Sequence, residues 1–228
     1  MPQKRIDMAN IFVRIKDEFV TDVRVIRERD PACRSGAEAL LLYAGLHAII
    51  AYRISHKLYK WRLFFLARLV SQISRFFTGI EIHPGATIGK GLFIDHGSGI
   101  VIGETTVIGD NCTIYQGVTL GGTGKHTGKR HPTLGDNVMV GAGAKVLGPF
   151  TVGSNSKIAA GAVVLDEIPE NSTAVGIPAR VIKQGDKRIC EDLDQVHIPD
   201  PVSQEFCRLQ AKISALEKRL SEIENKNE

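Results

Sequence analysis

The stretch TLGDNVMVGAGAKVLGPFTVGSNSKIAAGAVV, residues 133–164, has a branched aliphatic side chain at every sixth position. The same period extends back to residue 82 in two further blocks, so that thirteen positions fit it. They are Ile82, Ile88, Ile94, Ile102, Ile108, Ile114, Leu120, Leu134, Val140, Val146, Val152, Ile158 and Val164. A six-residue repeat of this kind indicates a parallel β-helix, whose short strands stack their aliphatic side chains into one core.

Two insertions interrupt the period. Eight residues rather than six separate Ile94 from Ile102, and fourteen separate Leu120 from Leu134. Insertions in such a coil form loops on one face, and this is often the binding face. Both insertions contain histidine, so we expect the chemistry of the protein there.

The segments around the repeat are predicted to be helical. From residue 9 to 77 apolar residues recur at helical spacing, with a break expected over residues 29–36, which contain Pro31 and Gly36. We therefore expect a helical domain at 1–78, the β-helix at 79–184 and a linker with a helix at 185–228. In the last segment an apolar seam alternates spacings of three and four at Phe206, Leu209, Ile213, Leu216, Leu220 and Ile223. It fits either a short coiled coil or a helix packed on its own subunit.

Composition narrows the classes of function. The 29 basic and 25 acidic residues give a net charge of +4 and are scattered, which argues against a nucleic-acid partner. No signal-peptide pattern begins the chain, and the longest mainly apolar uncharged run, residues 39–52, is shorter than the roughly 20 residues that span a membrane. We expect a cytoplasmic protein without membrane contact. Its four cysteines form no CxxC pair, which predicts free thiols and no metal site.

Five short motifs carry a resemblance to a known family. They are Ile-His-Pro-Gly at 82–85, Asp-His-Gly at 95–97, Gly-Gly-Thr-Gly-Lys at 121–125, Arg-His-Pro at 130–132 and Gly-Ile-Pro-Ala-Arg at 176–180. From about residue 30 to 183 the chain resembles the serine acetyltransferases. The last motif is shared by many hexapeptide-repeat acyltransferases, whereas the Asp-His-Gly and Arg-His-Pro elements in this order are more specific.

The resemblance implies a mainly β fold, a left-handed parallel β-helix with an N-terminal helical domain and a helical tail. It implies a serine O-acetyltransferase, which moves an acetyl group from acetyl-CoA to the L-serine hydroxyl and yields O-acetylserine for cysteine biosynthesis. In the family three subunits pack side by side, with each active site between neighbours.

The resemblance also assigns catalytic roles. His96 corresponds to the general base that removes the serine hydroxyl proton, a role that suits imidazole because a neutral acceptor is available at cellular pH. Many family members place an aspartate just before Ile-His-Pro to orient this base. Glu81 stands at that position here, so a carboxylate one methylene longer takes over the role.

Substrate contacts follow from the same motifs. Asp95 and Glu104 correspond to positions near the serine ammonium, and Asp30 to an aspartate that reaches serine from the helical domain. Arg130 and His131 correspond to the residues that hold the carboxylate and neighbouring oxygens.

For the co-substrate acetyl-CoA, the resemblance implies contacts in a narrow groove, with no metal involved. The expected residues are Gly122 in the glycine-rich loop, Ala142 and Ala160 along the groove, and Lys157 near the CoA phosphates. Ala159 stands where the family often has glycine, which alters the shape of that part of the groove.

Assembly and regulation are expected to follow the family in part. The portion ahead of Asp30 is shorter than in the long members that pair trimers into hexamers, so we expect a homotrimer. Members that dock into the sulfhydrylase of the next step do so with a tail ending in isoleucine; this chain ends in Glu228, so that complex is not expected. L-Cysteine is expected as a feedback inhibitor because it can occupy the serine site.

Three alternatives remain. One is an acetyltransferase of the same fold that acts on a sugar or another hydroxyl compound. Another is a zinc-dependent carbonic anhydrase with His96, His126 and His131 as ligands, because a catalytic zinc commonly takes three protein ligands. The last is a non-catalytic scaffold held together by the tail.

Overall fold

The computed structural model describes residues 20–124, 127–185, 209, 212–213 and 216. The chain divides into two units, residues 1–195 and residues 196–228. The described residues of the first unit form four helical segments and a coil of short strands. In the second unit the structure describes four helical residues, Leu209, Lys212, Ile213 and Leu216.

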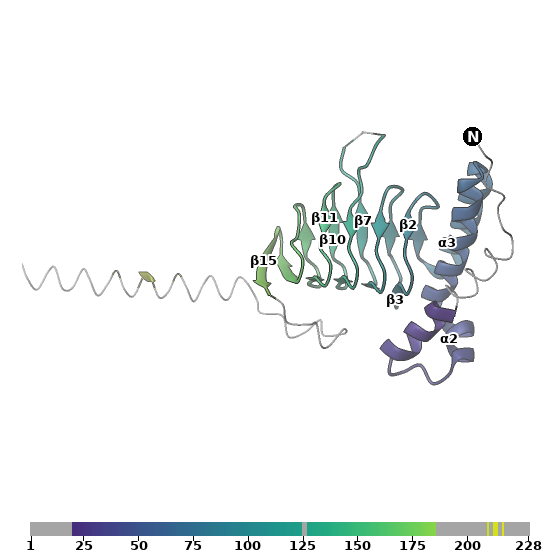
Figure 1. Cartoon of the computed structure of the whole chain (residues 1–228), viewed down its shortest axis with the longest axis horizontal. Helices are drawn as coiled ribbons and strands as arrows, with labels where there is room; N and C mark the ends of the chain where they lie inside the picture. Colours follow the sequence, from purple (N-terminus) through teal and green to yellow (C-terminus); the bar gives the residue numbers. More distant parts are fainter. Residues whose placement is uncertain (1–19, 125–126, 186–208, 210–211, 214–215, 217–228) are drawn as a thin grey trace, which may run out of the picture. The chain divides into compact units, whose positions relative to one another are not determined.

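The strands form three parallel sheets, which the chain visits in turn. Sheet A holds β1 (Glu81–Ile82), β4 (Val101–Ile102), β7 (Thr119–Gly121), β10 (Lys145–Leu147) and β13 (Val163–Val164). Sheet B holds β2 (Thr87–Ile88), β5 (Val107–Ile108), β8 (Thr133–Leu134) and β11 (Thr151–Val152). Sheet C holds β3 (Phe93–Asp95), β6 (Thr113–Tyr115), β9 (Met139–Val140), β12 (Lys157–Ile158) and β14 (Ser172–Gly176), with β15 (Ala179–Gln184) antiparallel at its edge. The strands therefore stack turn upon turn (Figure 1), and the predicted parallel β-helix is confirmed.

The core of the coil consists of the residues that set the six-residue period. All thirteen are buried, none more than 8% exposed. In sheet A, Ile82 pairs with Ile102, which pairs with Leu120. The corresponding positions of sheets B and C stack in the same manner. Full burial of one such side chain stabilises the fold by about 1.5–3 kcal/mol, so these stacks dominate the stability of the coil.

The coil has three corners, which we name by the sheets they join: A–B, B–C and C–A. At the B–C corner Asn111, Asn137, Asn155 and Asn171 adopt left-handed backbone with φ of 55–59°. The side-chain amides of three of them form a ladder, in which Asn137 Nδ2 donates to Asn155 Oδ1 at 3.1 Å and Asn155 Nδ2 donates to Asn171 Oδ1 at 3.2 Å. Asparagine tolerates this conformation better than most residues, so the B–C corner has a structural role.

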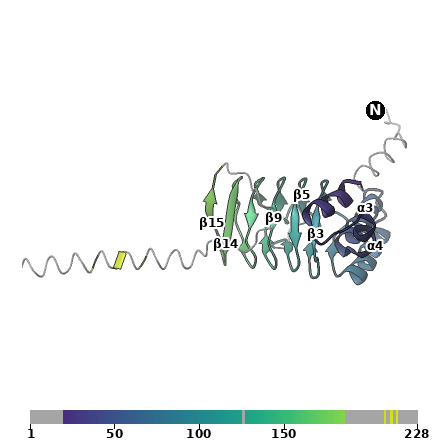
Figure 2. The same ribbon diagram turned by 90° about the horizontal axis from the view of Figure 1, so that it is seen from below.

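Helices cover the β1 end of the coil (Figure 2). Residues 20–29 are helical, followed by α2 (Gly36–Leu42), α3 (Ala44–Lys60) and α4 (Phe64–Thr78). The break expected over residues 29–36 is present, and two further breaks occur at Tyr43 and at residues 61–63. α3 packs closely on β3 at Gly45, which has no side chain. A Cβ atom added there would lie 2.5 Å from the Ile94 carbonyl oxygen.

Within the described residues, no single helix is long and apolar enough to cross a membrane. Only α2 and α3 taken together meet that criterion, and they bend by 72° at the break between them.

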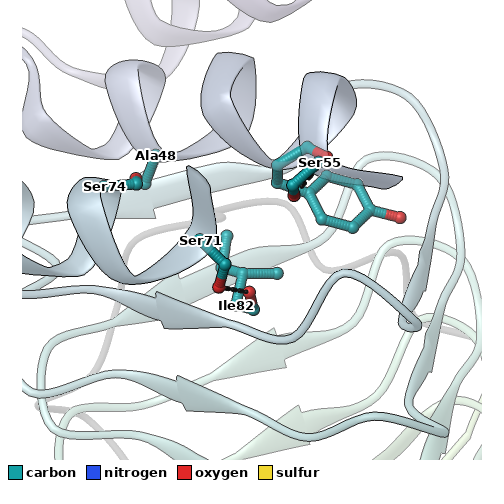
Figure 3. Close-up of a pocket in the computed structure, with 6 residues that line it drawn as sticks. Ala48, Ser55, Ser71, Ser74 and Ile82 are labelled. Carbon is teal, nitrogen blue, oxygen red and sulfur yellow. Dashed lines mark hydrogen bonds between the residues drawn. The ribbon is translucent and has the colours of Figure 1, made fainter. Parts of the chain in front are cut away.

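Small side chains allow α3 and α4 to approach each other over β1. Figure 3 shows Ala48, Ser55, Ser71 and Ser74 around Ile82 in a small hollow between these elements. The Ser71 hydroxyl donates to the Ile82 carbonyl at 2.7 Å, and the Ser55 hydroxyl donates to the Tyr52 carbonyl at 3.0 Å. Because these hydroxyl groups are paired with backbone, the hollow is a packing feature rather than a binding site.

A buried ion pair joins the first helical segment to α3. Asp22 is 2% exposed and accepts hydrogen bonds from Arg53 Nε at 3.1 Å and Nη2 at 3.0 Å. Asp22 also accepts from the Gly91 backbone N–H at 3.2 Å, while Arg53 donates to the Gly89 carbonyl at 3.3 Å. The pair therefore fixes both helices to the first turn of the coil.

Candidate functional site

The residues singled out by sequence lie mainly at two different corners of the coil. His96, Ala142 and Ala160 follow strands of sheet C and lie at the C–A corner. The A–B corner contains four others. Glu104 and Gly122 follow strands of sheet A, and Arg130 and His131 precede a strand of sheet B. Lys157 lies within β12 of sheet C. Each corner therefore carries a part of the predicted constellation.

His96 is the exposed reactive group of the C–A corner. Its side chain is 77% exposed, and Nε2 lies 3.8 Å from Asp95 Oδ1. Its backbone φ is 56°, which is left-handed. Among the described non-glycine residues, only Arg62 and the four asparagines of the B–C corner also have a positive φ. Strained backbone of this kind concentrates at functional sites, so the geometry marks His96 independently of the motif.

Asp95 and Asp30 form an acidic pair beside His96. Burial raises the pKa of the Asp95 carboxyl; nearby His96 opposes that rise, whereas nearby Asp30 adds to it. Asp30 is held by the Ala32 backbone N–H, which donates at 2.8 Å, and by the Tyr43 hydroxyl, which donates at 2.5 Å. Burial and the bond to Asp30 raise the pKa of Tyr43. This corner can therefore present two carboxylates to a cationic group.

Tyr43 was missed by the sequence analysis. It stands at the junction between α2 and α3 with extended backbone, φ −91° and ψ 103°. In the sequence, Tyr43 is a single tyrosine in a mainly aliphatic run, thirteen residues after Asp30. Nothing in that pattern identifies Asp30 as its partner.

Glu81 lies in β1 and pairs with arginines of α4. Its Oε2 is 3.3 Å from Arg75 Nη1 and its Oε1 is 3.9 Å from Arg68 Nη2. Among the contacts of the described residues, no hydrogen bond or ion pair joins Glu81 to His96. Among the described residues of the single chain, the carboxylate that pairs with His96 is Asp95.

Glu104 and Arg130 form an ion pair at the A–B corner. Arg130 Nη2 donates to Glu104 Oε2, and the Tyr59 hydroxyl of α3 donates to Oε1 at 3.1 Å. The bond from Arg130 lowers the pKa of the Glu104 carboxyl; burial opposes this effect, and the Tyr59 bond adds to it. The carboxylate is therefore kept ionised and the guanidinium is held at the corner.

His131 is buried in the same corner, with 8% of its surface exposed. Its Nδ1 accepts from the Thr105 backbone N–H at 3.2 Å and lies 2.9 Å from Thr105 Oγ1. Burial lowers the pKa of His131, and the Arg130 charge lowers it further. With Nδ1 used as an acceptor, the neutral ring carries its proton on Nε2 and can donate to a substrate oxygen.

Gly103 leaves room for the His131 ring. A Cβ atom at position 103 would lie 2.0 Å from Cδ2 and 2.1 Å from Nε2 of that ring. At Gly122 a Cβ would lie 3.1 Å from Arg130 Cγ and 3.2 Å from His131 Nε2. The ring therefore packs directly on bare backbone.

His83, within the Ile-His-Pro motif, is a further member of the A–B corner to which the sequence analysis gave no role. Its Nδ1 accepts from the Gly85 N–H at 3.0 Å, and its ring lies 6.0 Å from the Tyr59 ring. Burial lowers its pKa, and the Arg68 charge adds to this effect. It shares the surroundings of Glu104 and Arg130.

The turns of the C–A corner that follow β9 and β12 expose bare backbone. The Gly161 N–H donates to the Ala142 carbonyl at 2.8 Å, and the Gly143 N–H donates to the Gln116 carbonyl at 2.8 Å. A Cβ atom at Gly143 or Gly161 would meet nothing within 4 Å. A narrow, extended ligand could therefore lie along these turns, which are at the same corner as His96.

Cysteines and potential metal ligands are placed as follows. Cys33 and Cys112 are free thiols, while Cys190 and Cys207 lie outside the described residues. Within the described ranges no three His, Cys, Asp or Glu side chains come together as a metal-binding group. His126, one of the three ligands in the zinc alternative, lies outside those ranges.

Comparison with protein families matches three parts of the chain. Residues 7–51 match "Serine acetyltransferase, N-terminal", residues 131–166 match "Bacterial transferase hexapeptide (six repeats)", and residues 99–122 match "Hexapeptide repeat of succinyl-transferase". The serine acetyltransferase of Bacillus subtilis is 56% identical over 207 residues, which cover 91% of this chain and 94% of that protein. That of Bacillus licheniformis is 57% identical over 207 residues, covering 91% and 96%.

Solved structures of serine acetyltransferases also match this chain. The serine acetyltransferase of Neisseria gonorrhoeae matches with a TM-score of 0.75 at 44% identity, covering 81% of this chain and 71% of that one. A serine acetyltransferase in complex with cysteine matches with a TM-score of 0.78 at 45% identity, covering 81% and 72%. The Neisseria gonorrhoeae enzyme in complex with serine matches with a TM-score of 0.73 at 45% identity, covering 75% and 70%.

Proposed function

The chain belongs to the serine acetyltransferase family, and we propose that it transfers the acetyl group of acetyl-CoA to the hydroxyl of L-serine with residues of the C–A and A–B corners. The observation that carries the chemistry is the exposed, strained His96 beside a carboxylate pair. Such a group suits proton removal from a hydroxyl, whereas serine recognition needs both anionic and cationic partners.

His96 acts as general base in this proposal. Its ring accepts the serine hydroxyl proton while the oxygen attacks the thioester carbonyl carbon. The tetrahedral intermediate then breaks its carbon–sulfur bond, and the imidazolium returns the proton to the departing CoA sulfur. Asp95, 3.8 Å from Nε2, stabilises the charged ring. A base positioned in this way contributes about 10²–10⁴ to the rate.

Serine is recognised by opposite charges. Asp30 and Asp95 face the ammonium at the C–A corner, while Arg130 and the Nε2–H of His131 supply donors for the carboxylate at the A–B corner. Because these groups lie at different corners of one coil, we propose that each complete site combines the C–A corner of one copy with the A–B corner of a neighbouring copy. From the family resemblance we propose that three copies assemble in this way.

The surface of α4 supports this association. Phe65, Phe76 and Phe77 are 79%, 83% and 79% exposed, and Leu69 and Ile73 lie on the same helix with about half their surface exposed. Monomeric soluble proteins seldom expose so contiguous an apolar face.

Acetyl-CoA is placed along the bare backbone of the C–A corner, with its thioester near His96. Ala142 and Ala160 border this track, and Lys157 in β12 supplies a cation for the CoA phosphates. Gly122 lies at the other corner and reaches the same site only through a neighbouring copy. L-Cysteine, which replaces the hydroxyl of serine by a thiol, is proposed to inhibit at the serine site, as the relative solved with cysteine suggests.

The assay is CoA release from acetyl-CoA, with L-serine compared with homoserine and a galactoside. We expect a marked preference for L-serine and a loss of about 10²–10⁴ in kcat for His96→Ala. The temperature of unfolding should stay unchanged, because the ring is 77% exposed. A galactoside preference would instead support the sugar alternative, and an undiminished variant would remove His96 from the mechanism.

The two-copy site has its own test. Neither His96→Ala nor Arg130→Ala should be active alone, but co-refolded mixtures should regain activity, since some sites then combine an intact C–A corner with an intact A–B corner. Co-refolding each variant with itself is the control. Absence of recovery in mixtures whose size shows assembly would place the whole site within one chain.

A further inference from the structure

Tyr59, the penultimate residue of α3, contacts the A–B corner although the sequence analysis assigned it no role. Its hydroxyl donates to Glu104 Oε1 at 3.1 Å, and the other carboxylate oxygen of Glu104 accepts from Arg130 Nη2. Hydrogen bonds therefore connect the helical domain, through Glu104, to the arginine that is proposed to hold the serine carboxylate.

The direction of the Arg130 guanidinium depends on Glu104. Among the described residues, Glu104 is the one hydrogen-bond partner of this side chain, which is 26% exposed. A guanidinium has five N–H donors, so several are left to bind a ligand. Fixing one rotamer of so flexible a side chain before the ligand arrives lowers the entropy cost of binding. A group that fixes Glu104 therefore also sets where Arg130 points.

Glu104 is itself held by packing and by the Tyr59 hydroxyl. A Cβ atom added at Gly85 would lie 3.0 Å from Glu104 Cγ, so the Glu104 side chain packs on bare backbone of the preceding turn. That contact restrains the aliphatic part of the side chain, whereas the Tyr59 hydroxyl binds the carboxylate directly. Removing the hydroxyl would take a donor from Oε1 and allow the carboxylate to rotate.

The Tyr59 ring is held independently of its hydroxyl. Its centroid lies 5.0 Å from that of Phe64 and 6.0 Å from that of His83, with interplanar angles of 68° and 78°. Aromatic rings favour such edge-to-face contacts. Because both contacts involve the ring, Tyr59→Phe would remove the hydroxyl and leave the packing in place.

We propose that Tyr59 is a positioning residue for the substrate, whose hydroxyl holds Glu104 and thereby orients Arg130 toward the serine carboxylate. The inference rests on the proposed function, which assigns Arg130 to that carboxylate. α3 then serves both corners of its own chain. Tyr43, which precedes its first residue, holds Asp30, and Tyr59 near its end holds Glu104.

A purely structural role is the competing explanation, and Tyr52 provides the matched control. Tyr52 lies about two turns earlier on α3. Its hydroxyl donates to the Ala86 carbonyl at 2.7 Å and accepts from the Ile88 N–H at 3.2 Å. The same chemical group therefore attaches the same helix to the coil, but through backbone rather than through the ion pair.

The test measures CoA release from acetyl-CoA over a range of L-serine concentrations. We expect Tyr59→Phe to raise the KM for serine about ten-fold, because a hydrogen bond to a charged group contributes a factor of about ten or more. kcat should change by less than about two-fold, since the serine carboxylate does not react. Tyr52→Phe should lower the urea midpoint and leave the KM within about two-fold of wild type. An unchanged KM for Tyr59→Phe, or an equal rise for Tyr52→Phe, would overturn the proposal.

A Glu104→Ala background tests the route of the effect. Calorimetry of L-serine binding should show that Tyr59→Phe weakens affinity about ten-fold in the wild-type background, but not in Glu104→Ala, where the hydroxyl has lost its acceptor. The same loss in both backgrounds would show that Tyr59 acts without Glu104 and would reject its positioning role. Wild-type protein without a preference for L-serine would instead reject the proposed function, so the two failures are distinguishable.

Discussion

Gly103→Ala tests whether the packing of His131 on bare backbone positions the substrate. The added methyl carbon would lie 2.0 Å from His131 Cδ2 and 2.1 Å from Nε2, far inside ordinary contact distance. Neighbouring backbone anchors this ring, because Nδ1 is 3.2 Å from the Thr105 amide nitrogen and 2.9 Å from its hydroxyl. The imidazole would have to move by more than about 1 Å to regain van der Waals separation.

Such a displacement should act on catalysis more than on folding. A misplacement of about 1 Å at a positioning group can cost about 10²-fold in rate, equivalent to about 2.7 kcal/mol of transition-state stabilisation. We expect kcat/KM for L-serine to fall by that factor, since the Nε2–H donor moves with the ring. The KM for acetyl-CoA should change less, because three of its four proposed contacts, Ala142, Lys157 and Ala160, lie on sheet C or at the C–A corner.

CoA release measured over a range of serine concentrations checks this expectation. Gly128→Ala is the matched control, because a Cβ there meets nothing within 4 Å although it lies in the same loop as Arg130. Circular dichroism verifies that both variants retain the fold. Wild-type kcat/KM for Gly103→Ala, or an equal loss for Gly128→Ala, would refute the reasoning.

Three other predictions concern stability, pH and substrate affinity. Asp22→Ala should lower the free energy of unfolding by about 3–5 kcal/mol in urea, because it leaves a largely buried arginine without its carboxylate. Glu28→Ala, which removes an ion pair whose side chains are 64% exposed, should cost less than about 1 kcal/mol, and equal losses would contradict the role of burial. Burial lowers the pKa of His131, so below about pH 6.5 the unfolded chain binds more protons than the folded one and stability falls as the pH drops. His131→Asn should flatten that slope between about pH 7.5 and pH 5.5, and an unchanged slope would exclude His131 as its source. Tyr43→Phe removes the donor to Asp30 and should raise the KM for serine about five-fold, equivalent to about 1 kcal/mol, with kcat nearly unchanged; a loss confined to kcat would exclude the proposed positioning role.

Local sequence determined the coil. A side chain every six residues points inward whatever the rest of the chain does, because each short strand alternates its faces and each corner resets the direction. All thirteen phased positions are buried for this reason. The helices described from residue 20 to 78 were equally accessible to sequence reasoning, although the break at Tyr43 was missed. No proline marks this break, and the nearby Gly45 lies within α3.

Contacts between distant turns were decided only by the tertiary structure. The sequence motifs singled out Glu104, Arg130 and His131, but not that Thr105 would anchor the His131 ring or that Gly103 would leave room for it. The resemblance paired Glu81 with His96, whereas in the single chain Glu81 contacts arginines of α4. A repeat specifies which side chains face inward, but the partner of an outward-facing side chain depends on which turn, helix or neighbouring copy the completed coil brings beside it.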